Sequence, residues 1–591
     1  MNRSAWVLLA ASMLSASYLT GQAPVAPADR LIGIWGSDNS YGPRLRGELT
    51  VRRQDDGSWH ASLGGVATSA PIRGDSIILA FPGTLGWFRG AVAASGQIEG
   101  WWIQPPGLIY DQPFTTRLTL ARLRPGTWRG TVVPLEETFT LYLAIWRRAS
   151  DGALIGAFRN PEFNLRGPAS SYRVSLDGDS IRFSARPDTT QPEVRMAAHF
   201  DAQQSQVTMR WRQLGRTIVL TPRDTVQAVG LFTRVPRGQT YRYTVPEPEA
   251  DGWTTAAAGT VGFDEAALAR LVQRISDTLP FDARSPHIHS LLIARRGRLV
   301  LDEYFMGHDR TIPHDTRSAA KTYASVMVGA AMLGGIRIGP DTRLYPLVGD
   351  LGKGATADPR RDRITIGHLL THTTGLACDD NDDDSPGNEG TMQSQSAQPN
   401  WWRYTLELPM AFEPGSHYAY CSATMNLAGA ALTRATRTWL PEYFDRTIAR
   451  PLQFGRYYYN LQPTQEGYLG GGLRLTPRDL LKIGQVYLDG GAWHGRRIVS
   501  ADWVRRSTSL QVADSTQSAD GYAWHRGVLK VGDRTYREYE ANGNGGQFIM
   551  VVPELELAVA FTAGNYLGYG VWRHFRDTLL TEAIIPAISG R

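Results

Sequence analysis

A serine and a lysine three positions apart are the residues best suited to chemistry in this sequence. Ser318 and Lys321 are followed by an apolar run, 322–327, that has the composition of a buried helix. Residues three apart lie on one face of a helix, so the amine can contact the hydroxyl. A hydroxyl needs a base beside it to act as a nucleophile, and a desolvated lysine can lose its proton whereas arginine cannot. The spacing therefore predicts a nucleophilic serine; the alternative is a helix cap beside a surface lysine.

Composition indicates a folded protein of several domains. The chain has 591 residues, of which 42% are hydrophobic and 20% charged. The net charge of +6 is spread along the chain with no lysine and arginine block, which argues against a nucleic-acid or membrane-surface face. Only four residues are lysines, and Ser318 is the only serine with a lysine at the third position after it.

The amino-terminal segment has the pattern of a secretory signal peptide. A short positive region, 1–4, leads into an apolar run, 5–14, and then into small and polar residues up to Ala23. We therefore expect a signal peptide over 1–23 and a periplasmic or secreted protein. No later run is long enough to predict a membrane span.

Residues 31–222 read as an all-β region made of two similar units. Short alternating segments dominate, with almost no helical periodicity. Several short motifs recur in the same order, for example Trp35-Gly36 and Trp128-Arg129-Gly130. This predicts one unit over 31–125 and a second over 126–222, forming either two barrels or one larger sandwich. The region is either a scaffold without a ligand or a surface whose tryptophans contact carbohydrate or cell-wall material.

A different architecture is predicted after a linker at 223–262, which includes the run Pro246-Glu247-Pro248-Glu249-Ala250-Asp251-Gly252. Asp264 precedes an amphipathic helix, and 290–294 and 299–304 read as two strands of a hairpin. The helix that starts at Ser318 follows them directly.

Four sequence blocks carry a resemblance to the serine β-lactamase and penicillin-binding protein superfamily. They are Ser318-Ala319-Ala320-Lys321, the run 364–376, the run 412–422 and the glycine-rich run 471–480. Residues 263–591 are most similar to the branch of class C-like esterases and 6-aminohexanoate-dimer hydrolases. The resemblance implies an α/β (α+β) domain of the β-lactamase and transpeptidase kind, with an antiparallel sheet flanked by helices.

The resemblance also implies the roles of individual residues. Ser318 would be the acylated nucleophile, Lys321 its proton acceptor or electrostatic partner, and Tyr420 a second acid or base. Tyr418 is the alternative tyrosine. A neighbouring ammonium favours the phenolate, so the lysine and tyrosine can share the proton, and which of them is the formal base stays open. The backbone amides of Ser318 and Asn544 would form the oxyanion hole.

Two departures from the superfamily pattern bear on the substrate. Ser422 replaces the amide of the Tyr-x-Asn motif, and the strand that carries Lys-Thr-Gly in lactam-recognising enzymes has Ala541 in place of the lysine. Without that cation, efficient β-lactam hydrolysis is not expected. We expect substrate contacts from Ser422 and from the glycine-rich edge formed by Gly543, Gly545 and Gln547.

The only two cysteines, Cys378 and Cys421, flank motifs that the resemblance brings to one site, so we expect a disulfide rather than two free thiols. An acidic loop follows Cys378. It is either a solvated loop or a means of attracting a substrate ammonium through Asp379 or Asp380.

The residues together predict an exported serine hydrolase that cleaves a small ester, amide or peptide and needs no cofactor. A zinc site at His368 and His372 is disfavoured, because no Cys/His ligand spacing surrounds them. The alternatives are a D-amino-acid-specific peptidase, a weak β-lactamase, or a protein without catalysis that binds cell-wall material or carbohydrate.

Overall fold

The computed structural model describes residues 27–589, except for 72–75, 163–168, 187–191, 213, 235–237, 279–280, 282–284, 353, 355–356 and 514–518. The predicted signal peptide at 1–23 lies outside the described residues. Among the helices that are described, none has both the length and the apolar composition needed to cross a bilayer.

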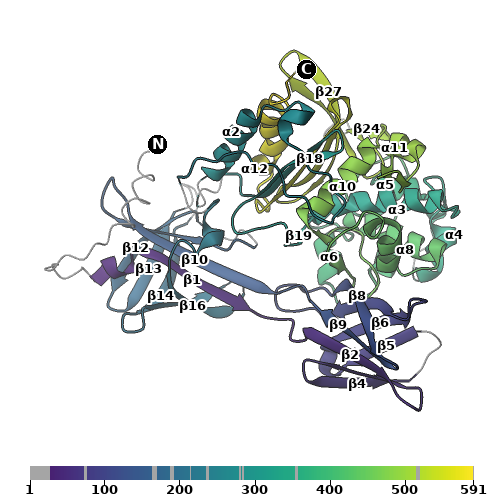
Figure 1. The fold of residues 1–591 in the computed structure, drawn as a ribbon, viewed down its shortest axis with the longest axis horizontal. Coiled ribbons are helices and arrows are strands. Elements are labelled where there is room, and N and C mark those ends of the chain that lie inside the picture. The colour runs from purple at the N-terminus through teal and green to yellow at the C-terminus, as the bar shows by residue number, and fades with distance from the viewer. Residues whose placement is uncertain are drawn as a thin grey trace.

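The amino-terminal half is all β, as predicted, and contains two sheets that are separate in space (Figure 1). One sheet is a closed antiparallel barrel. Its strands, in order around the barrel, are β1 (Gly33–Ser40), β10 (Thr138–Arg147), β11 (Leu154–Arg159), β12 (Tyr172–Asp177), β13 (Ser180–Ala185), β14 (Val194–Asp201), β15 (Gln206–Trp211) and β16 (Arg216–Arg223).

The second sheet, which we call the β2–β9 sheet, is also antiparallel. Its order is β4 (Val66–Ala70), β3 (Trp59–Leu63), β2 (Gly47–Arg53), β9 (Thr127–Val132), β8 (Phe114–Arg124), β7 (Ile98–Gln104), β6 (Gly86–Val92) and β5 (Ser76–Phe81). A short strand from the carboxy-terminal half, β20 (Tyr459–Asn460), pairs with the start of β8.

Strand pairing does not follow the predicted boundary between residues 125 and 126. The first strand of the predicted first unit, β1, pairs with β10 and β16 of the second, whereas β9 pairs with β2 and β8 of the first. Relative to the predicted repeats, the two units have therefore exchanged their first strands. The physical reason is that equivalent copies of a strand can complete either sheet, so local sequence does not determine which sheet each one joins.

The tryptophans at matched repeat positions are core residues. Trp35, Trp102, Trp128 and Trp211 are only 1–6% exposed. Trp35 packs in the barrel against Phe200 and donates its indole N–H to the Leu31 carbonyl, while Trp128 packs in the β2–β9 sheet against Trp59. These side chains are therefore not an exposed platform for carbohydrate.

The carboxy-terminal half is built on an antiparallel sheet whose hairpin at 290–304 matches the prediction. Its order is β18 (Arg298–Tyr304), β17 (Ile288–Arg295), β29 (Leu557–Ala563), β28 (Gln547–Val552), β27 (Arg534–Gly543), β26 (His525–Val531), β25 (Ala519–Asp520) and β24 (Val512–Ala513). Two small ladders accompany it, β19 (His314–Asp315) with β21 (Arg474–Leu475) and β22 (Ala492–Trp493) with β23 (Arg496–Arg497).

Helices cover both faces of this sheet, which is why its central strands are apolar on both sides (Figure 1). Along β28, Ile549 and Val551 point to one core, and Phe548 and Met550 to the other. One face packs against α2 (Glu265–Ser276), capped by Asp264 as predicted, α12 (Tyr569–His574) and the π-helical segment Phe575–Ile584.

The other face packs against α10 (Pro477–Leu488) and the helical layer that holds α3 (Thr322–Leu333). The remaining α-helices of that layer are α4 (Tyr345–Val348), α5 (Ile366–Leu370), α6 (Glu389–Ser394), α7 (Trp401–Glu407), α8 (Ser422–Thr436), α9 (Leu440–Phe444) and α11 (Ala501–Ser507).

The predicted linker and the β2–β9 sheet both pack on this carboxy-terminal part. Thr254 and Ala256 exchange backbone hydrogen bonds with Leu299 on the edge strand β18. Trp101 of β7 packs against Trp439, with ring centroids 5.6 Å apart, and belongs to the same hydrophobic core as α3. The β2–β9 sheet is therefore joined to the carboxy-terminal part through a shared core.

The strand exchange predicts which of the two sheets is destabilised when a core tryptophan is truncated. Trp35→Ala removes a buried indole from the barrel and should destabilise it by about 3–5 kcal/mol. In hydrogen-exchange mass spectrometry, amides of β10–β16 should lose protection while those of β2–β8 keep it. Trp128→Ala is the matched control and should give the reverse pattern. Loss of protection in β2–β8 on replacing Trp35 would contradict the observed pairing.

Candidate active site

Ser318 lies in the first turn of a buried helix. A 3-10 turn, Arg317–Lys321, leads directly into α3, whose residues Thr322–Ala331 are all buried. The residue before the serine, Arg317, has a left-handed backbone with φ of 48°, and its N–H donates to the carboxylate of Asp315 at 2.9 Å. Backbone strain of this kind costs energy and persists only where neighbouring contacts enforce it. Asp315 supplies one such contact beside the serine.

Lys321 contacts the serine, as its spacing predicts. Its ammonium Nζ donates to Ser318 Oγ at 2.9 Å and to the Gly470 carbonyl at 2.5 Å, and it lies 4.9 Å from the centroid of the Tyr420 ring. Burial alone would lower the pKa of Lys321, but Tyr420, Glu389 and Asp380 together raise it above its ordinary value. The resting amine therefore carries its proton.

Tyr420 lies beside that ammonium, just before α8. Its ring lies against His372, with centroids 4.7 Å apart, and its carbonyl accepts the N–H of Asp380 at 2.8 Å. His372 is buried, and its Nδ1 accepts the N–H of Cys421 at 3.2 Å. Burial, followed by Lys321, lowers the pKa of His372 to about 3, so this neighbour is neutral. Tyr420 lines a cavity with Ser318 and Lys321, and Tyr418 does not.

The end of β27 approaches the serine turn closely. A Cβ on Gly543 would lie 2.5 Å from the Thr316 carbonyl oxygen and 3.1 Å from the Ala319 nitrogen, so only glycine fits this approach. The following residue, Asn544, lines a cavity together with Ser318. This is the neighbourhood required of two backbone amides that stabilise an oxyanion.

Two cavities meet at Ser318. The larger, of about 280 Å³, is lined by polar side chains that include Arg317, Glu389, Tyr468 and Arg474. The smaller, of about 20 Å³, is lined by Lys321, Tyr420, His525 and others. It has room for about one water molecule. The nucleophile thus stands between a substrate-sized cavity and the proton-carrying side chains.

Comparison with known proteins assigns the family. Residues 287–566 match the family model described as Beta-lactamase. The chain is 27% identical over 223 residues to the 6-aminohexanoate-dimer hydrolase of Paenarthrobacter ureafaciens, a match that covers 35% of this chain and 54% of that protein. This part of the chain belongs to the serine β-lactamase and penicillin-binding protein superfamily.

Two further matches cover other shares of the chain. The monacolin J acid methylbutanoyltransferase of Aspergillus terreus is 29% identical over 155 residues, 24% of this chain and 37% of that protein. The solved structure of a penicillin-binding protein homologue from Caulobacter crescentus aligns with a TM-score of 0.43 and 14% identity, over 55% of this chain and 97% of that one. The chain spans about half the length, or less, of the first curated relatives it matches.

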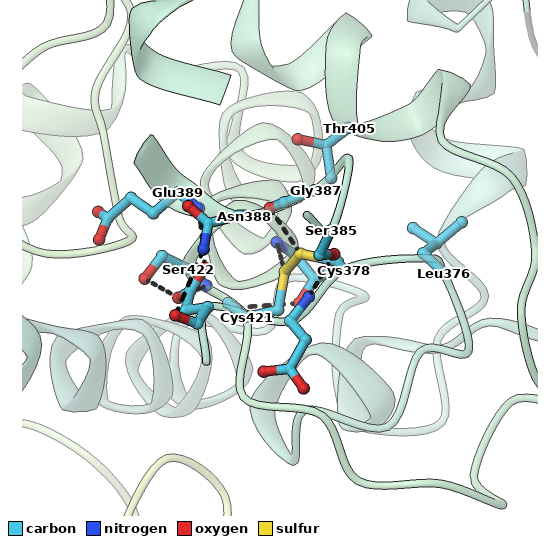
Figure 2. Close-up of a disulfide and its surroundings, with 12 residues drawn as sticks. Leu376, Cys378, Ser385, Gly387, Asn388, Glu389, Thr405, Cys421 and Ser422 are labelled. Carbon is cyan, nitrogen blue, oxygen red and sulfur yellow. Dashed lines mark hydrogen bonds between the residues drawn. A yellow bond between two sulfur atoms is a disulfide. The ribbon is translucent and has the colours of Figure 1, made fainter. Parts of the chain in front are cut away.

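The superfamily domain contains the predicted disulfide. Cys378 and Cys421 are bonded, with their Cα atoms 5.7 Å apart, next to α6 and α8 (Figure 2). The bridge ties the start of the acidic loop to the segment that carries Tyr420. Cys421 also caps α8, where its sulfur accepts the N–H of Thr424 at 3.1 Å.

The structure gives Asp380 a different role from the predicted substrate contact. One carboxylate oxygen accepts both the N–H and the hydroxyl of Ser422 at 2.7 Å, and the other accepts the N–H of Glu389 at 2.9 Å. Asp379 accepts the N–H of Asn381 within the exposed loop. Ser422, Asp379 and Asp380 line neither cavity at Ser318. Asp380 instead holds two helix starts together.

Apart from Asn544, the residues of the glycine-rich edge have contacts and backbone conformations that shape the end of the strand. Gly545 and Gly546 have φ of 97° and 101°, which side-chain-bearing residues rarely adopt. Gln547 is fully buried, and its amide bonds both the carbonyl and the N–H of Ala563. Gly543, Gly545 and Gln547 shape the strand end and line neither cavity at Ser318; substrate contacts from them stay a prediction.

Sequence reasoning missed Glu389, a partly buried acidic side chain from the end of the acidic run that lines the larger cavity. It is held by the Tyr468 hydroxyl, and burial raises the pKa of its carboxyl, which Lys321 in turn lowers. Its position at the end of the acidic run was visible in the sequence, but nothing local separated it from its exposed neighbours. The contribution of residues 109–114 to this cavity was not predicted either, because they belong to the β2–β9 sheet.

Within the described residues, three histidines are the only side chains gathered closely enough to suggest a metal site: His289, His308 and His314. The rings of His289 and His308 stack with centroids 4.0 Å apart, and His289 is hydrogen-bonded to His314 at 2.8 Å. Imidazole lone pairs lie in the ring plane, so parallel rings do not direct them to one point. Burial lowers the pKa of all three, which fits a stack of neutral rings.

The contacts of Asp380 predict that replacing it lowers stability, and lowers activity equally on cationic and neutral substrates. Asp380→Ala leaves two backbone N–H groups without their acceptor, so we expect stability to fall by about 2–4 kcal/mol. Hydrolysis of p-nitrophenyl hexanoate and p-nitrophenyl 6-aminohexanoate should slow by the same factor, because the Tyr420 segment shifts. Thermal unfolding and initial rates measure both effects. Asp382→Ala, in the exposed part of the loop, is the control; a loss confined to the amino ester would restore the ammonium-binding role.

Proposed function

We propose that this protein is a serine hydrolase that cleaves small carboxylic esters or amides through an acyl-enzyme on Ser318. The observation that carries the proposal is the 2.9 Å contact between Lys321 Nζ and Ser318 Oγ, with the centroid of the Tyr420 ring 4.9 Å from the same ammonium. Membership of a superfamily of serine hydrolases supports the reaction type.

The geometry supports the following sequence of steps. Ser318 Oγ attacks the carbonyl carbon, and its proton moves to Tyr420, since Lys321 already carries one. Tyr420 accepts this proton as its phenolate and becomes the neutral phenol. The amides of Ser318 and Asn544 stabilise the oxyanion. As the C–O or C–N bond breaks, Tyr420 returns the proton to the leaving group, and water then attacks the acyl-enzyme by the same route and releases the acid.

The substrate class is inferred from the larger cavity and the missing cation. A cavity of about 280 Å³ suits a small molecule. Ala541, at the place of the lactam-binding lysine, is 1% exposed and offers no charge, which disfavours a β-lactam carboxylate. The relative named 6-aminohexanoate-dimer hydrolase supports a small substrate. A D-amino-acid-specific peptidase or a weak β-lactamase remains the alternative within the same chemistry.

Covalent labelling distinguishes the hydrolase from a binding protein without catalysis. A fluorophosphonate probe should label the chain at Ser318, and Ser318→Ala should abolish labelling and lower kcat by about 10³-fold or more. Tyr420→Phe should lower kcat by about 10²–10⁴-fold by removing the proton carrier. The controls are Ser325→Ala, a buried serine on the same helix, and Tyr418→Phe. A folded chain that is neither labelled nor active on nitrophenyl esters would favour the binding protein.

We also propose that the protein is exported. The signal-like pattern of residues 1–23 and a disulfide between the only two cysteines support an oxidising compartment. Expression in a bacterial host should give a mature chain that starts near residue 24 and lies outside the cytoplasm. Amino-terminal sequencing of fractionated cells measures this, and an intact Met1 in the cytoplasm would contradict it.

A further inference from the structure

The larger cavity at Ser318 is closed on one side by the β2–β9 sheet. The segment 105–113 connects β7 to β8, and Ile109, Tyr110, Asp111 and Gln112 from it line the cavity together with Phe114, the first residue of β8. Figure 1 shows β8 directly beneath the helical layer that carries α6. The amino-terminal region is therefore part of the candidate site itself.

This wall is held rigidly from within its own half of the chain. The carboxylate of Glu137 accepts the N–H of Leu108 at 2.9 Å and that of Tyr110 at 3.1 Å. The turn also requires a glycine, because a Cβ on Gly107 would lie 1.9 Å from a Glu137 oxygen. Buried carboxylate contacts of this kind fix a loop in one conformation. The wall is thus preorganised and does not depend on substrate to form.

The wall is also fastened to the carboxy-terminal part. Asn460 pairs with Phe114 in the β20–β8 ladder, and the N–H of Leu461 donates to the Pro113 carbonyl at 2.9 Å. The guanidinium of Arg474 lies 4.3 Å above the Tyr110 ring and pairs with Asp315 at 3.5 Å. Since Asp315 also holds Arg317, only two residues, Arg474 and Asp315, separate Tyr110 of the wall from the turn that carries the nucleophile.

The position of the proton-carrying side chains shows which part of a substrate meets the wall. Lys321 and Tyr420 line the small cavity and do not line the large one. The leaving oxygen or nitrogen must receive a proton from that pair, so this atom faces their side of Ser318. The acyl group points the other way, into the large cavity.

The cavity lining indicates a polar acyl group. Gln112 and Asn460 bring amides to it, and Glu389 and Arg317 bring charged groups of both signs, while the wall adds the faces of Tyr110 and Phe114. A site with this many hydrogen-bonding groups favours a ligand that pairs with them, because unpaired polar groups lose their water contacts at a cost.

We infer that the segment 109–114 of the amino-terminal β2–β9 sheet forms the wall of the acyl-group subsite and selects esters or amides whose acyl chain carries hydrogen-bonding groups. This rests on the proposed acyl-enzyme function. The amino-terminal region then acts on the substrate of the hydrolase site, in place of the cell-wall or carbohydrate contact considered from the sequence.

Two substrate series separate the acyl side from the leaving-group side. The first keeps p-nitrophenol and varies the acyl group from acetyl to succinyl and 6-aminohexanoyl. The second keeps acetyl and varies the leaving group among p-nitrophenol, phenol and methanol. Gln112→Ala and Tyr110→Ala should change the ratio of kcat/KM for polar acyl groups to that for acetyl by about tenfold, the loss of one hydrogen bond or ring contact. Ratios within the second series should stay within about twofold.

The matched control is Gln97→Ala, an exposed glutamine in the turn at the opposite end of β7, which should change neither series. Fluorophosphonate labelling of each variant shows that the nucleophile is intact. Gln112→Ala removes a smaller side chain than Tyr110→Ala and leaves the Arg474 ring contact in place, so it guards against misfolding in the Tyr110 variant. Labelling with unchanged acyl ratios, or shifts confined to the leaving-group series, would overturn this inference alone. Absence of labelling in the unchanged chain would overturn the proposed function and this inference with it.

Discussion

The site depends on keeping a lysine charged inside the protein. Lys321 is 4% exposed, and removing an ammonium from water is costly unless partners replace the water. The ammonium donates hydrogen bonds to the Gly470 carbonyl and to Ser318 Oγ. Tyr420, Glu389 and Asp380 provide the negative electrostatic potential that favours the charged form of Lys321. These partners come from four separate stretches of the chain. Folding must bring all of these partners together before the Lys321 ammonium can be buried in its charged form. The contacts that stabilise the fold here are therefore the same contacts that keep Lys321 charged.

Asp380 shows how that constraint is met over a longer distance. Its carboxylate contributes potential at Lys321 and at the same time accepts N–H groups at the starts of α6 and α8. The disulfide beside it fixes the same two segments covalently (Figure 2). One acidic residue thus positions Tyr420, supports Glu389 and compensates the lysine. A charge that stabilises a neighbouring helix start need not contact the substrate to be essential.

The sequence predicted the parts of the site that depend on local spacing. Ser318 and Lys321 are a helical turn apart, and Cys378 and Cys421 are the only cysteines, so both pairings could be stated beforehand and both contacts are present. The residues that it missed, such as Glu389 and Tyr110, are set by tertiary contacts. Nothing within a few positions of Tyr110 indicates that Arg474, more than three hundred residues later, will stack on its ring. The exchange of β1 and β9 was missed for a related reason: the two strands have similar sequences, so neither sequence shows which sheet the strand joins.

The strand exchange and the substrate wall are physically connected. Because β9 joins the β2–β9 sheet and β10 joins the barrel, residues 133–137 must cross between the two units. Glu137 lies on this crossing and holds Leu108 and Tyr110, and Leu135 bonds Gln104 at the end of β7. The hydroxyl of Tyr458, next to β20, donates to the carbonyls of the same crossing. The segment by which the chain passes from one unit to the other is thus the same segment that holds Leu108, Tyr110 and Gln104. The exchange therefore supplies the support on which the wall rests.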